Sequence, residues 1–396
     1  MNVLTISARK NKGGASYIAG LIHSYLEGIG IVSKYFVGYG RLGFSYEAEN
    51  KHVINAKFWL KFSPVINWVF HMIFSRDIIS PREKQLVELV KESDVIICHI
   101  LHSYFIDYKY LIDIVNSYNQ NCKVILVNHD SWLYTGRCAI IETCNEWKNK
   151  CENCNHLSNY PRGLIRNNRH LFNRKVKAVN SLRNVMFVSP TNWIKNDLKQ
   201  VYPGIKTELI RNGINTEIFS TFGVKKIKGN DIKFCVSAYD LSQHGKINYD
   251  LTKQILELGY EIHFIGHNCP FVKYNNAIIH GYVSNKDVFV DILSQVDCYL
   301  FTSNIDNYPT VLIEAVCASN YIFYTPSKGA DEIMNGENKW LGSVIQTIQE
   351  FKNTINSETF KNTIINYPKR LELKNKALDY YNMQNMLSKY HELIRE

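Results

Sequence analysis

Short apolar segments alternate with helix-length segments along the chain, and this alternation forms two separate series. In the first series the predicted strands are residues 2–8, 94–101, 123–128, 184–189 and 207–211. The predicted helices of that series are residues 15–27, 81–92, 108–117, 166–182 and 192–201. In the second series the predicted strands are residues 232–238, 261–266, 297–302 and 321–325. Alternation of this kind favours parallel sheets that are flanked by helices, one sheet for each series.

The length of the chain also favours two domains. A chain of 396 residues exceeds what one hydrophobic core ordinarily supports and suits two α/β domains of about 200 residues each. A polar segment at residues 212–230, which contains Gly223 and three lysines, predicts the boundary between them.

Two carboxylates, Asp306 and Glu314, follow the third predicted strand of the second series. Asp306 is predicted to lie in the loop that leaves this strand, and Pro309 suits the first turn of the helix that follows. Glu314 would lie about two turns along that helix. In open α/β sheets ligands bind outside the carboxyl ends of the strands, and carboxylates there accept hydrogen bonds from sugar and ribose hydroxyls. The alternative for Glu314 is a helix-surface residue paired with a lysine.

The net charge of +10 is concentrated in the first half of the chain. Residues 1–200 contain 26 Lys or Arg against 15 Asp or Glu, whereas residues 201–396 contain 20 against 21. This asymmetry predicts an anionic partner for the first half only. Nucleic acid, an anionic membrane face and a phosphorylated lipid acceptor all satisfy it.

The most lipid-like segment is residues 57–76, in which Trp59 and Trp68 lie among apolar residues with basic residues at both ends. This pattern indicates an interfacial element, and the alternative is a core helix of the first domain. We find neither a secretory signal nor an uncharged run of membrane-spanning length. We therefore expect a cytoplasmic protein that rests peripherally on the inner face of the cell membrane.

Three further segments have the residue types of an anion- or sugar-binding site. Gly13 and Gly14 join the first predicted strand to the first helix, where backbone N–H groups can approach a diphosphate; the alternative is an ordinary turn. Gly245 and Lys246 follow the first strand of the second series, and His129 ends a strand of the first. A histidine at that end of a parallel strand favours a functional role over a core role.

Four cysteines lie within seventeen residues, and the last two form a Cys-x2-Cys pair. They are Cys138, Cys144, Cys151 and Cys154. Three interpretations stay open, namely a structural zinc site, reduced structural thiols and disulfides. A cytoplasmic setting disfavours disulfides.

These segments together resemble the retaining glycosyltransferases of family 4, which have the GT-B fold. The Asp306-x7-Glu314 element is similar to the Glu-x7-Glu motif of that family, with Asp in place of the first Glu. The stretch from His129 to Pro161, with its Thr-Gly-Arg-Cys turn and its cysteine spacing, resembles the colanic-acid and exopolysaccharide glycosyltransferases. The family usually has an Arg before Lys246, and this chain has none there.

The resemblance implies a role for each candidate residue. Asp306 and His129 would contact the donor sugar, Glu314 the ribose, and Lys246 the leaving diphosphate. The remaining donor-binding positions would be Gly13, Gly14, Gly245, Asn307, Tyr308 and Pro309. No Asp-x-Asp tripeptide occurs, so we expect no catalytic metal and no cofactor besides the donor itself.

The resemblance also implies a domain plan. Residues 1–212 would be a Rossmann-like, acceptor-binding domain with a cysteine-containing insertion at residues 137–161. Residues 213–370 would be a Rossmann-like domain for the nucleotide-sugar, and residues 371–396 a helix that crosses back to the first domain. The GT-B fold places the two parallel sheets on either side of a central cleft.

The predicted function is transfer of a sugar, with retention of configuration, to a lipid-diphosphate-linked saccharide during synthesis of a bacterial O-antigen, capsule or exopolysaccharide. The donor would be a UDP- or GDP-sugar, and we expect an anionic membrane surface but no nucleic acid as a partner. Two alternatives stay open: a nucleotide-sugar 2-epimerase of the same fold, and a non-catalytic, zinc-clipped basic protein that binds nucleic acid. The sequence specifies neither the sugar and its linkage nor the oligomeric state.

Overall fold

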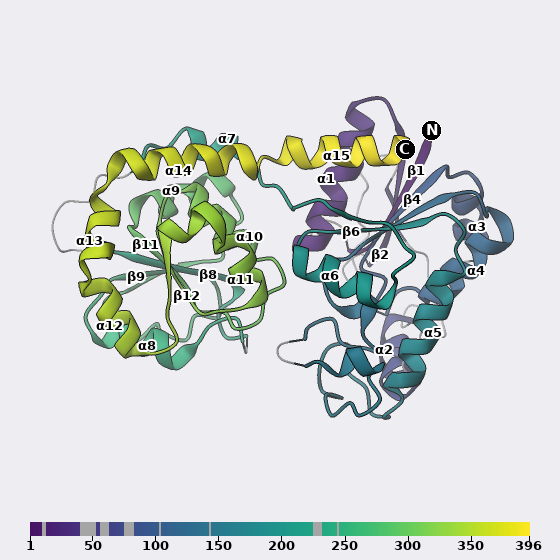
Figure 1. The fold of residues 1–396 in the computed structure, drawn as a ribbon, viewed down its shortest axis with the longest axis horizontal. Coiled ribbons are helices and arrows are strands. Elements are labelled where there is room, and N and C mark those ends of the chain that lie inside the picture. The colour runs from purple at the N-terminus through teal and green to yellow at the C-terminus, as the bar shows by residue number, and fades with distance from the viewer. Residues whose placement is uncertain are drawn as a thin grey trace. The chain divides into compact units, whose positions relative to one another are not determined.

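The computed structural model describes residues 1–9, 13–39, 53–55, 63–74, 83–102, 104–141, 144–224, 232–243 and 245–396. The chain divides into two compact units. The first comprises Met1–Arg211 together with Leu387–Glu396, and the second is Asn212–Met386. Each unit has its own parallel sheet (Figure 1). Each also has its own hydrophobic core.

The described part of the first unit contains a seven-stranded sheet in the order β3-β2-β1-β4-β5-β6-β7, and all neighbouring strands are parallel. The strands are β1 Asn2–Arg9, β2 Val32–Tyr39, β3 Val53–Asn55, β4 Val95–His99, β5 Lys123–Val127, β6 Val185–Ser189 and β7 Thr207–Leu209. The central strand β4 is buried along its whole length, as expected for a parallel strand covered on both faces.

The helices of this unit follow its strands in the chain. They are α1 Gly14–Gly28, α2 Ser63–Phe74, α3 Glu83–Lys91, α4 Tyr108–Tyr118, α5 Asn168–Asn180 and α6 Asn192–Val201, with short 3-10 helices η1 Trp132–Tyr134 and η2 Glu146–Asn149. Side-chain caps fix two of their starts: Asp107 accepts a hydrogen bond from the backbone N–H of Lys109, and Thr191 accepts one from Ile194.

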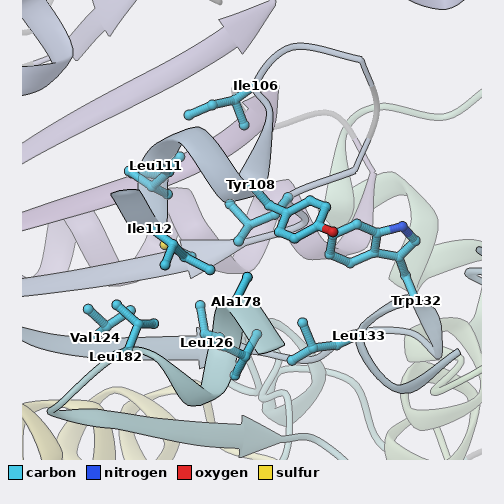
Figure 2. Close-up of a cluster of buried hydrophobic side chains, with 14 of the residues drawn as sticks. Ile106, Tyr108, Leu111, Ile112, Val124, Leu126, Trp132, Leu133, Ala178 and Leu182 are labelled. Atoms are coloured by element: carbon cyan, nitrogen blue, oxygen red, sulfur yellow. The ribbon is translucent and has the colours of Figure 1, made fainter. Parts of the chain in front are cut away.

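One core cluster of the first unit joins α4 and α5 to β5. Leu111 and Ile112 of α4 pack beside Val124 and Leu126 of β5, with Ala178 of α5 next to them (Figure 2). Trp132 and Leu133 of η1 extend this cluster into the cysteine-containing insertion. The insertion is therefore packed into the core of the first unit.

The buried Lys175 of α5 fixes the segment that leads into the insertion. Its ammonium group donates hydrogen bonds to the backbone carbonyls of Trp132 and Thr135, and lies 3.8 Å from the centroid of the Trp132 ring. Burial lowers the pKa of Lys175 to about 7.

The second unit contains a six-stranded parallel sheet in the order β10-β9-β8-β11-β12-β13 within its described residues. The strands are β8 Phe234–Asp240, β9 Ile262–His267, β10 Ala277–Gly281, β11 Cys298–Phe301, β12 Tyr321–Tyr324 and β13 Gly342–Val344. The helices are α7 Glu217–Ser220, α8 Tyr249–Glu257, α9 Lys286–Gln295, α10 Thr310–Cys317, α11 Lys328–Met334, α12 Ile348–Asn356, α13 Glu358–Ile365 and α14 Tyr367–Tyr380, with a 3-10 helix η3 at Gly336–Leu341.

These helices form two layers. One core cluster combines one face of the sheet with α7, α9, α10, α11 and α14, and the other combines the opposite face with α8, α12 and α13 (Figure 1). The two layers cover β11 and β12 completely, and both strands are buried throughout. The helices on both faces agree with the α/β sandwich expected from the alternating pattern.

The terminal segment is two helices, where the sequence predicts one. α14 ends at Tyr380 and α15 runs over Met383–Arg395. Between them, the carbonyl of Tyr381 accepts a hydrogen bond from the N–H of Ile214, and the N–H of Met383 donates to the carbonyl of Ile214. These hydrogen bonds to Ile214 interrupt the helical backbone between α14 and α15. From Leu387 onward, α15 belongs to the first unit, where Lys123 donates to the carbonyl of Leu393.

Helix α2 covers part of the lipid-like segment at residues 57–76. Trp68 is 46% exposed on it, so the described part of this segment is not a core helix. Trp59 lies outside the described residues, as do the basic residues Lys57, Lys61 and Arg76 that flank the segment. No helix in the described ranges combines the length and the apolar character that crossing a membrane requires.

Candidate functional site

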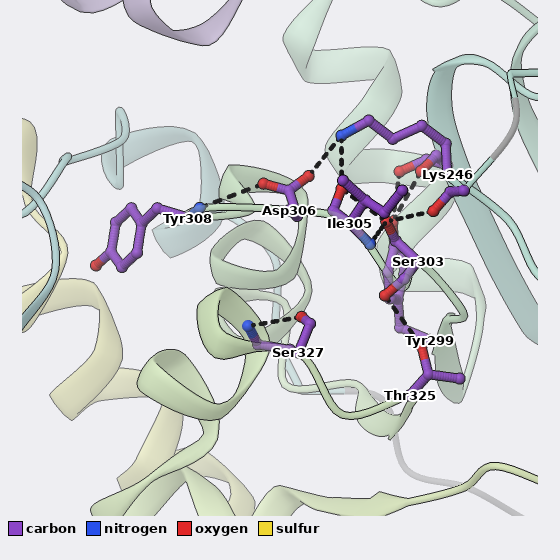
Figure 3. A network of polar contacts seen from close by, with 11 residues as sticks. Lys246, Tyr299, Ser303, Ile305, Asp306, Tyr308, Thr325 and Ser327 are labelled. Atoms are coloured by element: carbon purple, nitrogen blue, oxygen red, sulfur yellow. Dashed lines mark hydrogen bonds and ion pairs between the residues drawn. The ribbon is translucent and has the colours of Figure 1, made fainter. Parts of the chain in front are cut away.

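The loop between β11 and α10 brings Asp306 to Lys246. The ammonium group of Lys246 lies 2.9 Å from the Oδ2 atom of Asp306 and also donates to the carbonyl of Ile305 (Figure 3). Both side chains are partly exposed. A cation and a carboxylate from the ends of neighbouring strands β8 and β11 therefore meet at the carboxyl edge of the sheet.

Close backbone contacts fix this loop. Gly245 has a φ of 81°, a backbone conformation that favours glycine. A Cβ atom at this position would also lie only 2.4 Å from Ile305 Cδ1, so a larger residue would not fit. Ser303 donates from Oγ to the carbonyl of Gly245, and Thr325 donates to the carbonyl of Ser303 (Figure 3). The loop is thus connected to both β8 and β12.

The residues between the two carboxylates lead directly into α10. The backbone N–H of Tyr308 donates to Oδ1 of Asp306, and the Tyr308 side chain is buried. Pro309 is the N-cap of α10, one residue before the first-turn position that the sequence predicted. Gly329, which the sequence analysis did not single out, is the second residue of α11 and lies so close to the backbone of Asp306 and Asn307 that any side chain would clash.

Glu314 is buried inside α10, with 5% of its surface exposed. Its Oε1 atom lies 2.5 Å from the ammonium group of Lys286, at the start of α9. Its Oε2 atom is buried and has no hydrogen-bond partner among the described residues. The predicted alternative of a lysine pair is thus observed, but on a buried carboxylate that retains a free acceptor. No sequence signal pointed to Lys286, which lies 28 residues away.

The helix end after Glu314 is fixed by two neighbouring residues. Ser319, with a φ of 64°, adopts the left-handed conformation that commonly ends a helix. Asn320 is buried and donates from its side chain to the carbonyls of Leu293 and Val296. Its amide therefore links α10 to the end of α9.

Three exposed aromatic side chains lie at the carboxyl ends of β8, β9 and β10. The rings of His267 and Tyr282 stack with centroids 4.7 Å apart and an interplanar angle of 10°. The Tyr239 ring meets them at 5.2 and 5.4 Å, respectively. We call these three residues the aromatic platform. The sequence analysis missed it because each ring lies alone in the sequence, at the end of its own strand.

In the first unit, the predicted residues also lie at the carboxyl edge of the sheet. Gly13, with a φ of 86°, caps α1, and Gly14 is its first residue. Among the described residues, none would lie within 4 Å of a Cβ atom placed on either glycine, so they leave the space above this helix start open. His129 follows β5, two strands away from β1 in the sheet.

His129 belongs to a group of polar side chains. Its Nε2 atom lies 2.9 Å from Nδ1 of His99, and the two rings stack. Burial lowers the pKa of His129 to about 4, against a weaker opposite effect of Asp130. Burial and then His129 lower the pKa of His99 well below its usual value. Both imidazoles are therefore neutral at pH 7, and His129 can exchange hydrogen bonds but carries no charge.

Next to them, Asp130 pairs with His102 through Oδ2 at 2.7 Å, and its Oδ1 atom accepts from the N–H of Trp132. These contacts hold the pKa of Asp130 below its usual value despite burial. Asp130 orients the start of the insertion.

The four clustered cysteines are free thiols, and three of them are buried. Burial, followed by the neighbouring thiols Cys154, Cys151 and Cys144, raises the pKa of Cys138 to about 12. The Cys151 sulfur accepts from the N–H of Gly136. In the part of the chain that is described, no three His, Cys, Asp or Glu side chains have the spacing that a metal ion needs. The zinc hypothesis gains no support from this geometry, and we assign the cluster no metal.

Comparisons with known proteins agree with this architecture. No protein-family model matches the sequence. WcaC of Escherichia coli (strain K12) is 27% identical over 98% of this chain and 98% of its own length; its name, a provisional assignment, is colanic acid biosynthesis glycosyl transferase. A solved glycosyltransferase from Rickettsia africae has a TM-score of 0.63 at 13% identity, covering 100% of this chain and 97% of its own. The chain is a glycosyltransferase with the GT-B fold. Anabaena HepE, solved with UDP-glucose, has a TM-score of 0.59 at 14% identity, covering 100% of this chain and 99% of its own.

The glycosyltransferase resemblance and the GT-B fold inferred from the sequence are thereby confirmed. Membership of the retaining family 4 is consistent with these findings and stays a prediction, as do the individual roles of the site residues.

Proposed function

We propose that the protein is a retaining hexosyltransferase of family 4 that takes a sugar from a UDP- or GDP-sugar. The donor would bind at the carboxyl edge of the second unit's sheet. The observation that carries this proposal is the buried Glu314, of which one oxygen is held by Lys286 and the other has no hydrogen-bond partner among the described residues. An unpaired buried acceptor is costly, and a ribose hydroxyl would satisfy it. HepE, a protein of the same fold, was solved with UDP-glucose, which supports a UDP-sugar as a donor to test.

The catalytic work would be positioning and electrostatics. Lys246 would stabilise the negative charge that develops on the leaving diphosphate, while Asp306 holds its ammonium group in place and accepts from a sugar hydroxyl. The open helix start at Gly13 and Gly14 would supply backbone N–H groups for an anion. The neutral His129 would hydrogen-bond the donor sugar. We assign no nucleophile, because retention by a front-face route needs none.

The acceptor would be a lipid-diphosphate-linked saccharide bound by the basic first unit. The name of WcaC, the relative with full-length similarity, supports a place in the synthesis of a bacterial surface polysaccharide such as an O-antigen, a capsule or an exopolysaccharide. Such an acceptor would keep the enzyme at the inner face of the cell membrane.

A panel of UDP- and GDP-sugars tests the donor proposal. We expect one nucleotide class to raise the thermal unfolding temperature and to be turned over, and we expect Glu314→Gln to weaken its binding. Loss of a charged hydrogen-bond acceptor corresponds to roughly 1.5–3 kcal/mol of binding free energy. Glu332→Gln, a change on α11, is the matched control. If the Glu314 variant binds the nucleotide as the wild type does, Glu314 is not part of the donor site.

A further inference from the structure

Helix α2 faces the protein with its polar side chains and the solvent with its apolar ones. Asn67 is fully buried and donates to the carbonyl of Tyr104, and the buried His71 contacts the Tyr104 ring edge-on at 4.9 Å. The exposed side chains on this helix are Val65, Ile66, Trp68 and Val69. This is the reverse of the pattern of a surface helix that faces water.

A second segment, distant in sequence, enlarges this apolar surface. Leu164 donates from its backbone N–H to the carbonyl of Met72, near the end of α2, at 2.7 Å. The side chains of Leu164 and Ile165 are 65% and 45% exposed, so two large aliphatic groups continue the outer face of α2. Arg162 and Arg166 lie on either side of them and are exposed as well.

The buried Arg137 fixes this second segment. Its guanidinium donates to the carbonyl of Ile165 and to the Oδ1 atom of Asn167. Gly163 passes so close to the guanidinium that a side chain there would collide with it. The Thr-Gly-Arg-Cys turn thus supports the segment from beneath, and Leu164 and Ile165 are held in an exposed position.

A polar groove of about 570 Å³ lies beside the apolar surface, between the Cys-x2-Cys turn and the start of α5. Arg166, Arg169 and His170 line it, with Glu152 paired to Arg169. Asn168 also lines it, is 4% exposed, and has no hydrogen-bond partner in the described residues for either atom of its side-chain amide. A buried amide without partners indicates that a polar ligand group belongs next to it.

The charge of the groove lining is positive overall, because Arg166 and Arg169 outnumber its one acidic residue, Glu152. Between residues 153 and 196 the sequence contains eight Lys or Arg and no Asp or Glu. A basic groove next to exposed Trp and Leu side chains complements a bilayer with anionic head groups, since apolar groups enter the acyl boundary and arginines bind phosphates.

We propose that α2 and residues 162–166 form a membrane-docking surface, and that the adjoining groove binds the phosphate of an anionic lipid head group. The apolar side chains would enter the bilayer interface, and Arg166 and Asn168 would contact the phosphate. This inference rests on the proposed function in one respect: a lipid-linked acceptor is the reason why the enzyme would bind a membrane.

Vesicle co-sedimentation of the full-length protein tests the proposal without any sugar donor. We expect binding to vesicles of phosphatidylcholine with one quarter phosphatidylglycerol, and roughly tenfold weaker binding to phosphatidylcholine alone. The double variant Leu164→Ser/Ile165→Ser and the variant Arg166→Glu should each lower binding roughly tenfold, whereas Val272→Ser and Arg183→Glu, exposed elsewhere, should not. All variants should keep the wild-type thermal shift with nucleotides, which separates this proposal from the donor proposal.

Four results would overturn the proposal. The wild type could fail to bind anionic vesicles, the variants at residues 164–166 could bind as well as the controls, or the controls could lose binding equally. Stabilisation by inorganic phosphate without vesicle binding would assign the groove to a soluble phosphate ligand and would likewise overturn the membrane assignment.

Discussion

Two carboxylates eight residues apart have different surroundings, and this difference separates their roles. Asp306 is partly exposed and pairs with Lys246, so it can exchange a protein partner for a sugar hydroxyl at small cost. Glu314 is buried, and its ion pair with Lys286 uses one oxygen, while the second has no partner among the described residues. Because an unpaired buried carboxylate would be strongly disfavoured, Lys286 has a structural role even if it never contacts a ligand.

Lys246→Ala tests the charge proposed for the leaving diphosphate. Because this charge develops in the transition state, we expect kcat to fall by roughly 10²–10³ while the donor Kd changes by less than tenfold. Steady-state kinetics and nucleotide titration measure the two effects separately. Lys253→Ala, which removes an exposed lysine of α8, serves as the control. A loss confined to the donor Kd would assign Lys246 to ground-state binding alone.

At the scale of elements, the ends of β8, β9 and β10 carry the aromatic platform of Tyr239, His267 and Tyr282. Exposed rings at the carboxyl edge of a parallel sheet are placed where ligands of such sheets bind. Tyr282→Ala should weaken nucleotide binding by roughly 1–3 kcal/mol if a base stacks there, since base–aromatic stacking has this magnitude. Tyr380→Ala, equally exposed at the end of α14, is the control for isothermal titration with UDP and GDP. Equal affinities for both variants would exclude the platform from the donor site.

The strands that the sequence predicted are those that are apolar and buried. β4, β5, β6, β11 and β12 read as short apolar runs, and the structure covers them on both faces. β10 lies at a sheet edge and is largely exposed, so its pattern gives no strand signal. β3 and β13, with three residues each, were also not predicted. β2 was also missed, because polar residues interrupt its apolar run.

The residues of the candidate site also fall into two groups, those that the sequence predicted and those that it did not. The sequence places Asp306, Lys246, Gly245 and Glu314 at strand ends and on the following helix, because local spacing alone determines that. The Lys286 partner, the platform and the Arg137 support depend on contacts between elements far apart in the chain. The break at Tyr381 likewise comes from hydrogen bonds to Ile214, about 170 residues earlier. Tertiary contacts of this kind leave no pattern in the local amino-acid sequence, so they cannot be predicted from it.

At the scale of the whole molecule, the two units differ in charge and in their buried titratable groups. The first unit carries the excess of Lys and Arg, and also the buried His99 and His129, whose pKa values are lowered by burial. A group whose folded pKa lies below its unfolded value of about 6.5 binds more protons in the unfolded chain. Its contribution to stability is therefore fully present above pH 6.5 and is lost as the pH falls through the folded pKa.

Acid should consequently destabilise the first unit before its carboxylates titrate. The shift of His129 from 6.5 to about 4 corresponds to roughly 3 kcal/mol of unfolding free energy, most of it lost between pH 6.5 and pH 4, and His99 adds to this loss. Urea unfolding between pH 7 and pH 4.5 measures it, followed by tryptophan fluorescence, since five of the six tryptophans belong to the first unit. His129→Asn should flatten the pH dependence because the variant cannot gain that proton, and His156→Asn, in the same unit but outside the pair, should leave it unchanged. An unfolding free energy that stays constant over this range would show that the two imidazoles are already protonated, or solvated, in the folded protein.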